Sequence, residues 1–421
     1  MQRKSRLDAV RFVDLLMFSS QHLDQVSLED LANDFGEKHG LSISKQALQE
    51  RFNEQAVNFL MELLNRQLKS QLPGLPIDKR IDYARFSSIK VKDSTRFELP
   101  ASYACAYKGH GGVSSPAQIS IQYEYDLLTG KPVVLQLTSA CRNDQQDSKQ
   151  TLQDIGKGEL LIRDMAYVSQ AYLTHITTVG AYYLNRLNPK WIVHDKDDKP
   201  IDFGKLRAKI DRHNLPVTEV EGFIRMGKNR LRTRLIVSRV PDKVYQDRIY
   251  HADRAAKSKG YNLTQEYKTR ASLNLFITNI PKEWIETEHI RRTYSLRWQI
   301  ELVFKAWKSQ ASIDKMKAFK LHRFQCQLIA RFLWLLIHTQ VRQLIDQWTS
   351  SDSAFQSSTQ KFFKTAFRLS HLLREVLFYN SVLSMWMERM LLDLGRKYFT
   401  ETRKHRPNVS AAISQICHSL A

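Results

Sequence analysis

The strongest constraint on the fold is a pair of short apolar runs typical of strands covered on both faces. In GELLIRDMAY, at 158–167, two Leu and one Ile follow one another without a polar break, and the strand pattern stops at Asp164. ASLNLFITNI, at 271–280, has the same covered-strand pattern. Continuous rather than alternating apolar residues are typical of strands buried on both faces in sheets covered by helices. The sequence therefore predicts an α/β protein with an acid at one strand end.

Residues 1–75 are predicted to form a helical N-terminal domain. Ser27 stands three residues before Asp30, which is a capping-box pattern, and Ser42 or Ser44 can begin a second helix. Two helices joined by a short turn, with Lys and Gln side chains facing outward, suit a DNA-reading module and a plain helical bundle equally well. The pattern leaves both interpretations open.

The period of the apolar residues changes to two beyond a linker predicted at 72–78, where LPGLPID holds two prolines and a glycine. In FSSIKVKDS, Ile and Val alternate with Lys90 and Lys92, which predicts a half-buried strand that ends at Asp93. The segment 117–139 has two alternating halves around a Thr-Gly-Lys-Pro turn and predicts a hairpin. Together these segments predict a small antiparallel sheet.

The chain carries a large excess of positive charge. Among 421 residues, 64 are Lys or Arg and 43 are Asp or Glu, so the formal charge is +21. Such an excess implies a polyanionic partner, either nucleic acid or an anionic membrane surface. The most apolar run, at 328–338, is too short to cross a bilayer and contains Arg331, so it predicts a buried core helix. Because the N-terminus also lacks the pattern of a secretory signal, we expect a cytoplasmic protein that binds nucleic acid and no membrane.

Basic residues and strand patterns come together between 169 and 273. One strand pattern there places Arg230, Arg232 and Arg234 at period two on a single face. Solvated strand faces usually mix their charges, so a row of positive charge alone favours a surface that follows the DNA backbone.

Cysteine and histidine give no clear metal site. His194 beside Asp195 can in principle bind a metal ion, but a lone His in a basic segment is more often a surface residue. The cysteines form no C-x-x-C pair and have no nearby His at zinc spacing, so we interpret all of them as ordinary thiols. They are Cys105, Cys141, Cys326 and Cys417.

YSLRWQIELVFKAWK, at 294–308, is predicted to lie on one continuous helix with two stripes. The apolar stripe, expected to face the core, comprises Leu296, Ile300, Val303 and Trp307. The polar stripe comprises Tyr294, Arg297, Glu301, Lys305 and Lys308.

Two interpretations of the polar stripe compete: a ladder of surface ion pairs, and a phosphate-binding face around a metal-binding carboxylate. In a ladder, Arg297 and Lys305 would compete for the one carboxylate of Glu301. Exposed ion pairs of this kind stabilise a helix by only about 0.3–0.5 kcal/mol each. The excess of cations around one Glu therefore favours the phosphate-binding interpretation.

Asp93 and Asp164 at predicted strand ends and Glu301 on a later helix form a set of three carboxylates. Hard divalent cations prefer oxygen ligands, and a rigid sheet positions carboxylates well. A single Asp at a strand end is usually a turn or cap residue, so the argument depends on the combination. In a strongly basic protein, the set points to two-metal phosphodiester chemistry, with ions about 3.5–4 Å apart.

The polar stripe also resembles a known signature. The spacing of Tyr294, Arg297, Glu301 and Lys308 is similar to the Y-R-E-K signature of the DDE transposases of bacterial insertion sequences, the IS-four family. The surrounding RWQIELVFKAWK resembles the family in the Trp after the Arg and in the Phe-Lys that follows the Glu.

Two further blocks carry the resemblance. Asp93 begins Asp-Ser-Thr, which resembles the family's block of Asp, a small residue and Thr. Asp164 begins Asp-Met-Ala-Tyr, which resembles its Asp-x-Gly/Ala-Tyr block, with Ala166 where Gly is commoner. The blocks fall in order along the chain, and the resemblance covers about 85–345.

The resemblance implies a ribonuclease H-like catalytic core interrupted by a β-rich insertion domain, with helical N- and C-terminal domains. On this chain, the corresponding segments are an N-terminal helical DNA-binding domain at 1–75, the two parts of the core at 80–168 and 274–345, the basic β-rich insertion at 169–273, and a helical C-terminal domain for dimerisation at 346–421.

The resemblance also implies a function. A transposase of this kind binds the terminal inverted repeats of its element as double-stranded DNA, pairs two ends in a homodimer, and cuts and pastes the element. Asp93, Asp164 and Glu301 would hold Mg²⁺, for which Mn²⁺ can substitute, and the cations of the polar stripe would bind DNA phosphates. Such a protein is prokaryotic and works at the nucleoid.

Three tryptophans are candidates for stacking on an extruded base. Trp298 suits that role, although a Trp beside an apolar helix stripe is more often part of the core. Trp191 and Trp284 suit it equally well, and the sequence does not choose between them. Two other functions stay open: a DNA-binding regulator without catalysis, and a nuclease of ribonuclease H-like fold that cuts structured DNA without strand transfer.

Overall fold

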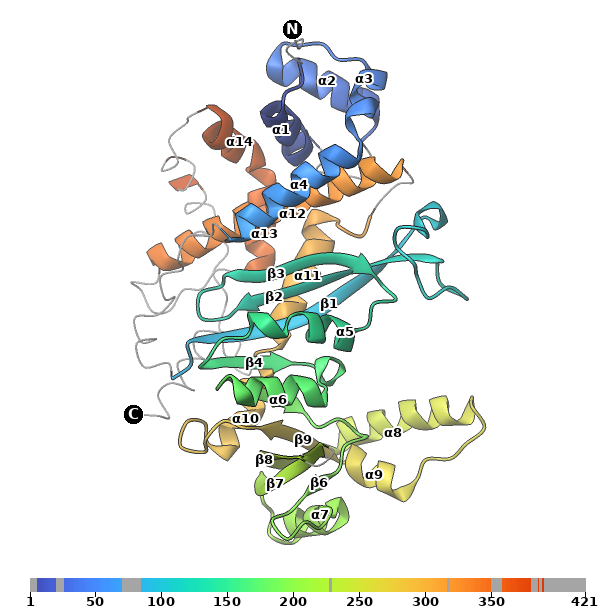
Figure 1. Cartoon of the computed structure of the whole chain (residues 1–421), viewed down its shortest axis with the longest axis vertical. Coiled ribbons are helices and arrows are strands. Elements are labelled where there is room, and N and C mark those ends of the chain that lie inside the picture. Colours follow the sequence, from blue (N-terminus) through green and yellow to red (C-terminus); the bar gives the residue numbers. More distant parts are fainter. Residues whose placement is uncertain are drawn as a thin grey trace. The chain divides into compact units, whose positions relative to one another are not determined.

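The computed structural model describes residues 6–19, 26–69, 85–226, 229–315, 319–349 and 358–379, with 385, 388 and 389. These residues form a mixed α/β fold (Figure 1). The described strands are β1 (Ser88–Leu99), β2 (Ala117–Asp126), β3 (Pro132–Ser139), β4 (Glu159–Arg163), β5 (Tyr182–Arg186), β6 (Val193–His194), β7 (Thr218–Met226), β8 (Asn229–Arg239) and β9 (Leu273–Thr278). They form one nine-stranded sheet in the order β3-β2-β1-β4-β5-β9-β8-β7-β6.

Helices precede, interrupt and follow the strands. Those that the structure describes are α1 (Ala9–Ser19), α2 (Leu28–His39), α3 (Lys45–Arg51), α4 (Glu54–Lys69), α5 (Asp144–Gln150), α6 (Gln170–Thr178), α7 (Phe203–Arg212), α8 (Asp242–Lys257), α9 (Gln265–Ala271), α10 (Ile290–Ser295), α11 (Trp298–Ala311), α12 (Leu321–Thr349), α13 (Thr359–Arg368) and α14 (Ser370–Tyr379). The linker predicted at 72–78, most of the Ser-rich stretch after α12 and most of the predicted C-terminal domain lie outside the described residues.

The chain divides into two compact units. The first unit comprises Met1–Lys79, Asp93–Arg142 and Trp298–Ser410. The second unit comprises Arg80–Lys92, Asn143–Arg297 and Ala411–Ala421. The boundaries predicted for the five domains stay predictions.

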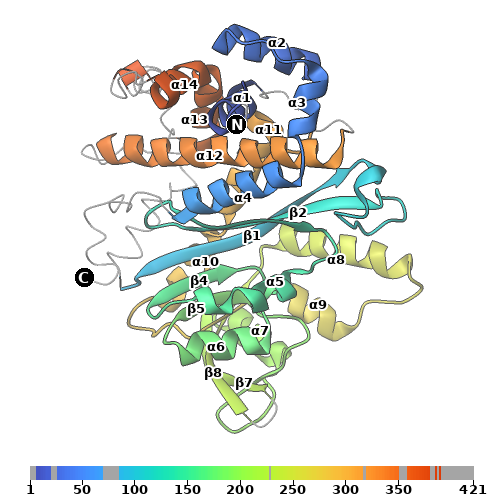
Figure 2. The same ribbon diagram turned by 45° about the horizontal axis from the view of Figure 1, so that its top comes forward.

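In the first unit, α4 lies alongside α12 in both views (Figures 1 and 2). The apolar run at 328–338 lies on α12 and is buried, which confirms the predicted core helix. Arg331 is buried with it, and its guanidinium carbon lies 5.9 Å from the ring centroid of Phe367. Within the described residues, we find no helix whose length and apolar content would let it span a membrane.

The helix starts predicted in the N-terminal segment are confirmed by their caps. The Ser27 hydroxyl accepts the N–H of Asp30 at 3.0 Å, and the Asp30 carboxylate accepts the N–H of Ser27 at 2.8 Å. Ser44, and not Ser42, caps α3. Gly40 ends α2 with a φ of 63°, in the left-handed region that favours glycine.

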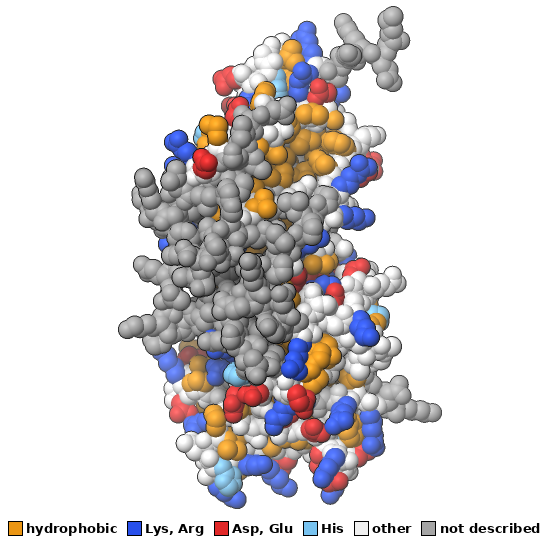
Figure 3. Space-filling view, turned by 90° about the vertical axis from the view of Figure 1, so that its left-hand side faces the viewer, with side chains coloured by type: hydrophobic (Ala, Val, Ile, Leu, Met, Phe, Trp, Pro, Cys, Tyr) orange, Lys and Arg blue, Asp and Glu red, His pale blue; other side chains and the backbone are white. Residues whose placement is uncertain are grey.

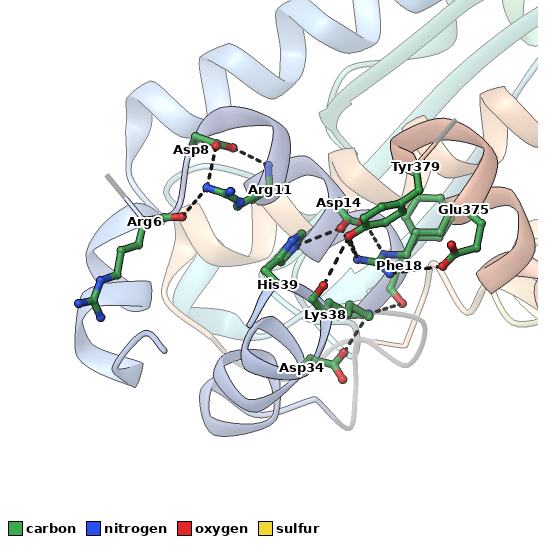
Figure 4. Close-up of polar contacts among 12 residues, drawn as sticks. Arg6, Asp8, Arg11, Asp14, Phe18, Asp34, Lys38, His39, Glu375 and Tyr379 are labelled. Carbon is green, nitrogen blue, oxygen red and sulfur yellow. Dashed lines mark hydrogen bonds and ion pairs between the residues drawn. The ribbon is translucent and has the colours of Figure 1, made fainter. Parts of the chain in front are cut away.

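A buried cluster joins α1 to α14 within the first unit (Figure 4). Asp14 is 1% exposed and accepts hydrogen bonds of 2.6 and 2.7 Å from Arg374. His39 Nε2 lies 3.1 Å from the same carboxylate, and the Tyr379 hydroxyl accepts from Arg374 at 3.0 Å. Burial lowers the pKa of Arg374, but the hydrogen bonds and charge of Asp14 outweigh burial, so that pKa is raised. The two ends of the described chain are therefore held together by a desolvated ion pair.

In the second unit, β4 pairs in parallel with β1 and with β5, and β5, β9, β8, β7 and β6 continue the sheet through antiparallel pairs. Helices α5 and α6 lie over one face of β4 and β5 (Figures 1 and 2). Leu161, Tyr183 and Ile277 pack in its core against Tyr172 and Leu173 of α6. The segment predicted to be β-rich contains helices α6 to α9 as well as strands.

The prediction that β1 is half-buried and ends at Asp93 is wrong. The strand continues to Leu99, and Lys90 and Lys92 are buried rather than solvated. Each lysine meets a carboxylate, because Lys90 lies 2.6 Å from Glu159 and Lys92 lies 2.5 Å from Asp147. The hairpin of β2 and β3 is confirmed, and its strands are antiparallel.

The prediction of one continuous helix over 294–308 is also wrong. The N–H groups of Leu296 and Arg297 bond to carbonyls three residues back, so a tighter turn separates α10 from α11. The buried stripe also differs from the predicted one. Val303, which was predicted to face the core, is only partly buried, and Phe304 beside it is buried. The other three predicted apolar positions are buried, as expected.

We expect Asp14→Asn to destabilise the first unit. The Arg374 guanidinium would lose its counter-charge inside the protein, and breaking a buried pair in this way costs about 3–5 kcal/mol. Urea unfolding followed by circular dichroism would measure this as a lower midpoint. The double variant Asp14→Leu/Arg374→Met removes both charges and should recover much of the loss.

The matched control is Asp8→Asn. Asp8 and Arg11 form an ion pair at the start of α1, and their side chains are 50% and 38% exposed. An exposed pair of this kind contributes about 0–1 kcal/mol. Equal midpoints for Asp14→Asn and Asp8→Asn would contradict a stabilising role for the buried cluster.

Candidate active site

Asp164 lies where the covered-strand pattern predicts it. It directly follows β4, and its Oδ1 accepts the N–H of Ala166 at 3.1 Å, which caps the turn at Met165–Tyr167. Asp93 lies within β1 rather than at its end, and its Oδ1 accepts the N–H of Ser94 at 2.8 Å. In both cases a local backbone hydrogen bond fixes the carboxylate.

Tyr294 of α10, in the polar stripe, interacts electrostatically with Asp164. Its side chain is buried at 7% exposure, and its ring centroid lies 5.1 Å from that of Phe276 on β9. Burial raises the pKa of Tyr294, and the negative charge of Asp164 raises it further. Arg297 opposes that shift through its charge and its approach to the hydroxyl, although the pair does not meet full hydrogen-bond geometry.

Arg186 is a site residue that the sequence reasoning missed. It ends β5, and its guanidinium carbon lies 5.8 Å from the centroid of the Tyr294 ring. Its charge also lowers the Tyr294 pKa. Because β5 runs parallel to β4 and Ile162 pairs with Leu184, both Asp164 and Arg186 come at the carboxyl ends of neighbouring strands. The sequence did contain one signal for this residue, because Arg186 ends the largely apolar strand segment Tyr182–Arg186.

The second unit therefore gathers one carboxylate, one buried tyrosine and two guanidinium groups. Asp164, Arg186 and Arg297 all act on the pKa of the Tyr294 hydroxyl. A carboxylate beside an excess of cations suits a site where a metal ion and a phosphate are bound together.

The remaining residues of the polar stripe lie on α11 in the first unit. Lys308 donates from Nζ to the backbone carbonyl of Arg96 on β1 at 3.2 Å, whereas Lys305 is exposed and Glu301 is partly buried. The helix is fixed from its other side, because the Trp307 ring lies 4.7 Å from that of Tyr123 on β2.

Trp298 is 50% exposed, so the interpretation that placed it in the core is wrong. Ile300, two residues further along α11, is buried, and residues two apart on a helix point to different faces, so Trp298 points away from the buried stripe. The other two candidates are partly buried. Trp284 packs against Phe86 and Tyr182, and Trp191 packs against the core of the second unit.

His194 is also packed against an aromatic ring. Its imidazole stacks on Phe223 with centroids 5.5 Å apart, and it is partly buried rather than fully exposed on the surface. Cys105, Cys141 and Cys326 carry free thiols, as expected, and Cys417 lies outside the described residues.

The arginine row on β8 is not a row of uncompensated positive charge, which corrects the premise behind its predicted role. Acidic residues on β7 and in the loop between β6 and α7 face it. Arg230 pairs with Asp198 at 2.8 Å, and Arg232 pairs with Glu221 at 2.9 Å. On the face drawn in Figure 3, Lys and Arg are likewise interspersed with Asp and Glu.

Arg234 differs from its two neighbours because it is buried. It forms two hydrogen bonds of 2.8 Å with Glu219 and donates to the carbonyls of Ile280 and Ile285. Burial raises the pKa of Glu219, but the hydrogen bonds from Arg234 and Thr287 outweigh burial, so that pKa is lowered. The geometry of Arg234 is that of a structural residue, whereas contacts of Arg230 and Arg232 with DNA stay a prediction.

The three predicted metal-binding carboxylates are divided between the units. Asp93 and Glu301 belong to the first unit, and Asp164 belongs to the second. Their chemistry fits Mg²⁺ or Mn²⁺, because hard divalent ions prefer carboxylate oxygens. Among the residues whose positions are described, no three His, Cys, Asp or Glu side chains gather closely enough to hold a metal ion.

Comparison with known proteins identifies the family. Residues 84–337 match the transposase DDE domain. The chain is 30% identical over 410 residues to the transposase for insertion sequence element IS231E of Bacillus thuringiensis subsp. finitimus, a match that covers 89% of this chain and 86% of the relative. It is 27% identical over 405 residues to the transposase for insertion sequence element IS1151 of Clostridium perfringens, with the same two coverages. The domain match takes in Asp93, Asp164 and the whole polar stripe, and the chain therefore belongs to the family of proteins that carry the transposase DDE domain.

Proposed function

We propose that this protein is a DNA transposase that binds the terminal inverted repeats of an insertion sequence, pairs two ends as a homodimer, and cuts and joins DNA. The observation that carries this proposal is the grouping of Asp164 with Tyr294, Arg186 and Arg297 in a DDE-domain chain. The names of its relatives, which are transposases of insertion sequence elements, support the same conclusion. The Y-R-E-K spacing assigns the protein to the IS-four family within this proposal.

The strand order supports a ribonuclease H-like core. In such a core, an antiparallel hairpin is followed by parallel strands that bring acids to one edge. Here β3, β2, β1, β4 and β5 are neighbours in that order, and β4 is parallel to both β1 and β5. In this proposal, β6, β7 and β8 with helices α7 to α9 form the insertion domain.

In the proposed active site, Asp93, Asp164 and Glu301 hold Mg²⁺, or Mn²⁺ in its place. When bound, these ions activate the attacking oxygen and stabilise the leaving oxygen of a phosphodiester. The pairing of β1 with β4 supports the assignment of the two aspartates. Lys92 and Arg163 are partners in register, and Asp93 and Asp164 are the residues that follow them.

The side chains of the polar stripe bind and orient DNA in this proposal. Arg297, Lys305 and Lys308 bind phosphates by charge-assisted hydrogen bonds, and the Tyr294 hydroxyl donates one more. The hydroxyl is protonated at neutral pH, as in an ordinary tyrosine, and burial raises its pKa further. Arg186 adds a second guanidinium beside it, and the exposed ring of Trp298 stacks on an extruded base.

Substituting the carboxylates tests the catalytic part of the proposal. Asp164→Asn and Glu301→Gln should abolish Mg²⁺-dependent cleavage of a duplex that carries the DNA end flanking the gene, while binding of that duplex remains. Metal ions supply several kcal/mol of transition-state stabilisation, so the cleavage rate should fall roughly 1,000-fold or more. Single-turnover cleavage on denaturing gels measures the rate, and gel shift measures binding.

Asp197→Asn is the matched control, because Asp197 is an exposed acid in a loop of the second unit. Tight binding with no strand cut by the unmodified protein would favour a DNA-binding regulator. Cleavage without joined products in a target plasmid would favour a nuclease that lacks strand transfer.

The exposed position of Trp298 gives a second prediction. Trp298→Ala should slow end processing by about 5- to 150-fold, because stacking of one base on an aromatic ring contributes about 1–3 kcal/mol. The melting temperature should stay close to that of the unmodified protein, because half of the side chain is already in solvent. Leu302→Ala, at an exposed position one turn along the same helix, serves as the control. Normal processing by Trp298→Ala would exclude the stacking role.

Lys308→Ala separates the two interpretations of the polar stripe. If the stripe binds phosphates, this change and Lys305→Ala should both weaken DNA binding, with a smaller dependence of affinity on salt. Lys308→Ala also removes the hydrogen bond to the Arg96 carbonyl, which contributes about 0.5–1.5 kcal/mol. A large fall in melting temperature with normal cleavage would instead support an ion-pair ladder.

A further inference from the structure

A buried polar network lies behind the strands that carry the two aspartates. It comprises Lys92, Asp147, Ser148, Thr151 and Arg163, all in the second unit, and we call it the buried network. Lys92 lies 2.5 Å from Asp147, with both side chains 0% exposed, and donates to the Thr151 hydroxyl at 3.1 Å. Arg163 donates to the Ser148 hydroxyl at 3.3 Å. Thus α5 and the residue that follows it contact both β1 and β4.

The register places this network directly behind the aspartate positions. Lys92 and Arg163 are partners in the parallel β1–β4 pair. Side chains alternate between the two faces of extended backbone. Asp93, the next residue of β1, and Asp164, the extended residue that follows β4, therefore point to the opposite face. A hydrogen bond of 2.8 Å from the Asn185 amide to the Arg163 carbonyl fixes the neighbouring end of β5 in the same way.

Stability alone does not explain the network. Burying two charges costs several kcal/mol per ion, and apolar side chains of similar volume are often as stable or more stable. The sequence of α5, DQQDSKQ, contains no apolar residue, so hydrophobic burial does not attach this helix to the sheet. Its buried contacts are polar and fixed in direction, and they end on the residues before Asp93 and Asp164.

We propose that Lys92 and Asp147 are positioning residues for the metal-binding aspartates. The ion pair fixes the backbone and the rotation of β1 at Lys92, while Ser148 and Tyr172 fix β4 at Arg163. Helix α5 thereby fixes the alignment of β1 and β4 along the strand direction, next to Asp93 and Asp164. This inference rests on the proposed function, because it assumes that Asp93 and Asp164 bind Mg²⁺. Mg²⁺ demands a near-ideal octahedral arrangement, so small errors in carboxylate position matter.

The test replaces the ion pair by apolar side chains, in the variant Lys92→Met/Asp147→Leu. Removing both charges together avoids an unpaired buried charge, so the melting temperature should be unchanged or higher. We expect Mg²⁺-dependent cleavage of the end-bearing duplex to fall roughly 10- to 100-fold, the usual effect of losing the residues that orient metal ligands. Binding of the same duplex in EDTA should be unchanged. Mn²⁺ affinity, measured by electron paramagnetic resonance on the protein–DNA complex, should weaken by a similar factor.

The same two strands provide a matched control. Lys90 and Glu159 form another, largely buried pair at 2.6 Å, which lies at the first residue of β4 and two residues before Lys92 on β1. Lys90→Met/Glu159→Gln removes this pair and keeps an acceptor for the N–H of Gly156. It should leave cleavage and Mn²⁺ affinity unchanged. Equal losses in the two double variants would show a general effect on the sheet and overturn the inference.

The outcomes separate this inference from the proposed function. If the unmodified protein cuts and Lys92→Met/Asp147→Leu folds, cuts and binds Mn²⁺ equally well, the positioning role is excluded and the proposed function stands. If the unmodified protein never cuts, the proposed function fails, and Mn²⁺ affinity alone decides the inference. If the double variant does not fold, Lys92→Gln/Asp147→Asn removes both charges and keeps polar side chains at the two positions. Unchanged Mn²⁺ affinity in Lys92→Gln/Asp147→Asn would then overturn the inference.

Discussion

Lys92 and Arg163 are paired in register on neighbouring parallel strands, and the rest of the candidate site depends on that pairing. Parallel strands need a long crossover, so residues far apart in the chain meet only through the sheet. Once this register is fixed, the alternation of side chains decides which residues face α5 and α6 and which face α10. Leu161 and Tyr183 pack with the α6 core, whereas Arg186 lies over the Tyr294 ring. A shift of one residue would exchange the two faces.

The features that local sequence predicts are those whose causes are local. The Ser27 cap needs only a partner three residues away, and the end of β4 at Asp164 follows from a short apolar run and a capping acid. The β2–β3 hairpin follows from alternation around a turn, and the burial of α12 follows from its apolar content. The similarity of the three blocks to transposase sequences required no contact information either.

What the sequence did not predict depends on partners from elsewhere in the chain. A lysine that alternates with apolar residues gives the same pattern whether it faces water or a buried carboxylate, so the burial of Lys92 requires knowledge of Asp147. The arginine row looks uncompensated on β8 alone, but Glu219 and Glu221 face it diagonally from β7. Arg186 was missed for the same reason, because only the β4–β5 register relates it to Asp164.

The turn between α10 and α11 changes how the polar stripe must be understood. No Pro or Gly marks this point, yet the helix tightens there and divides the stripe between the two units. Tyr294 and Arg297 belong with Asp164, whereas Glu301 and Lys308 belong with the unit that contains Asp93. Their spacing therefore does not describe one face of one helix. The spacing instead gives the number of residues that connect two groups, one in each unit.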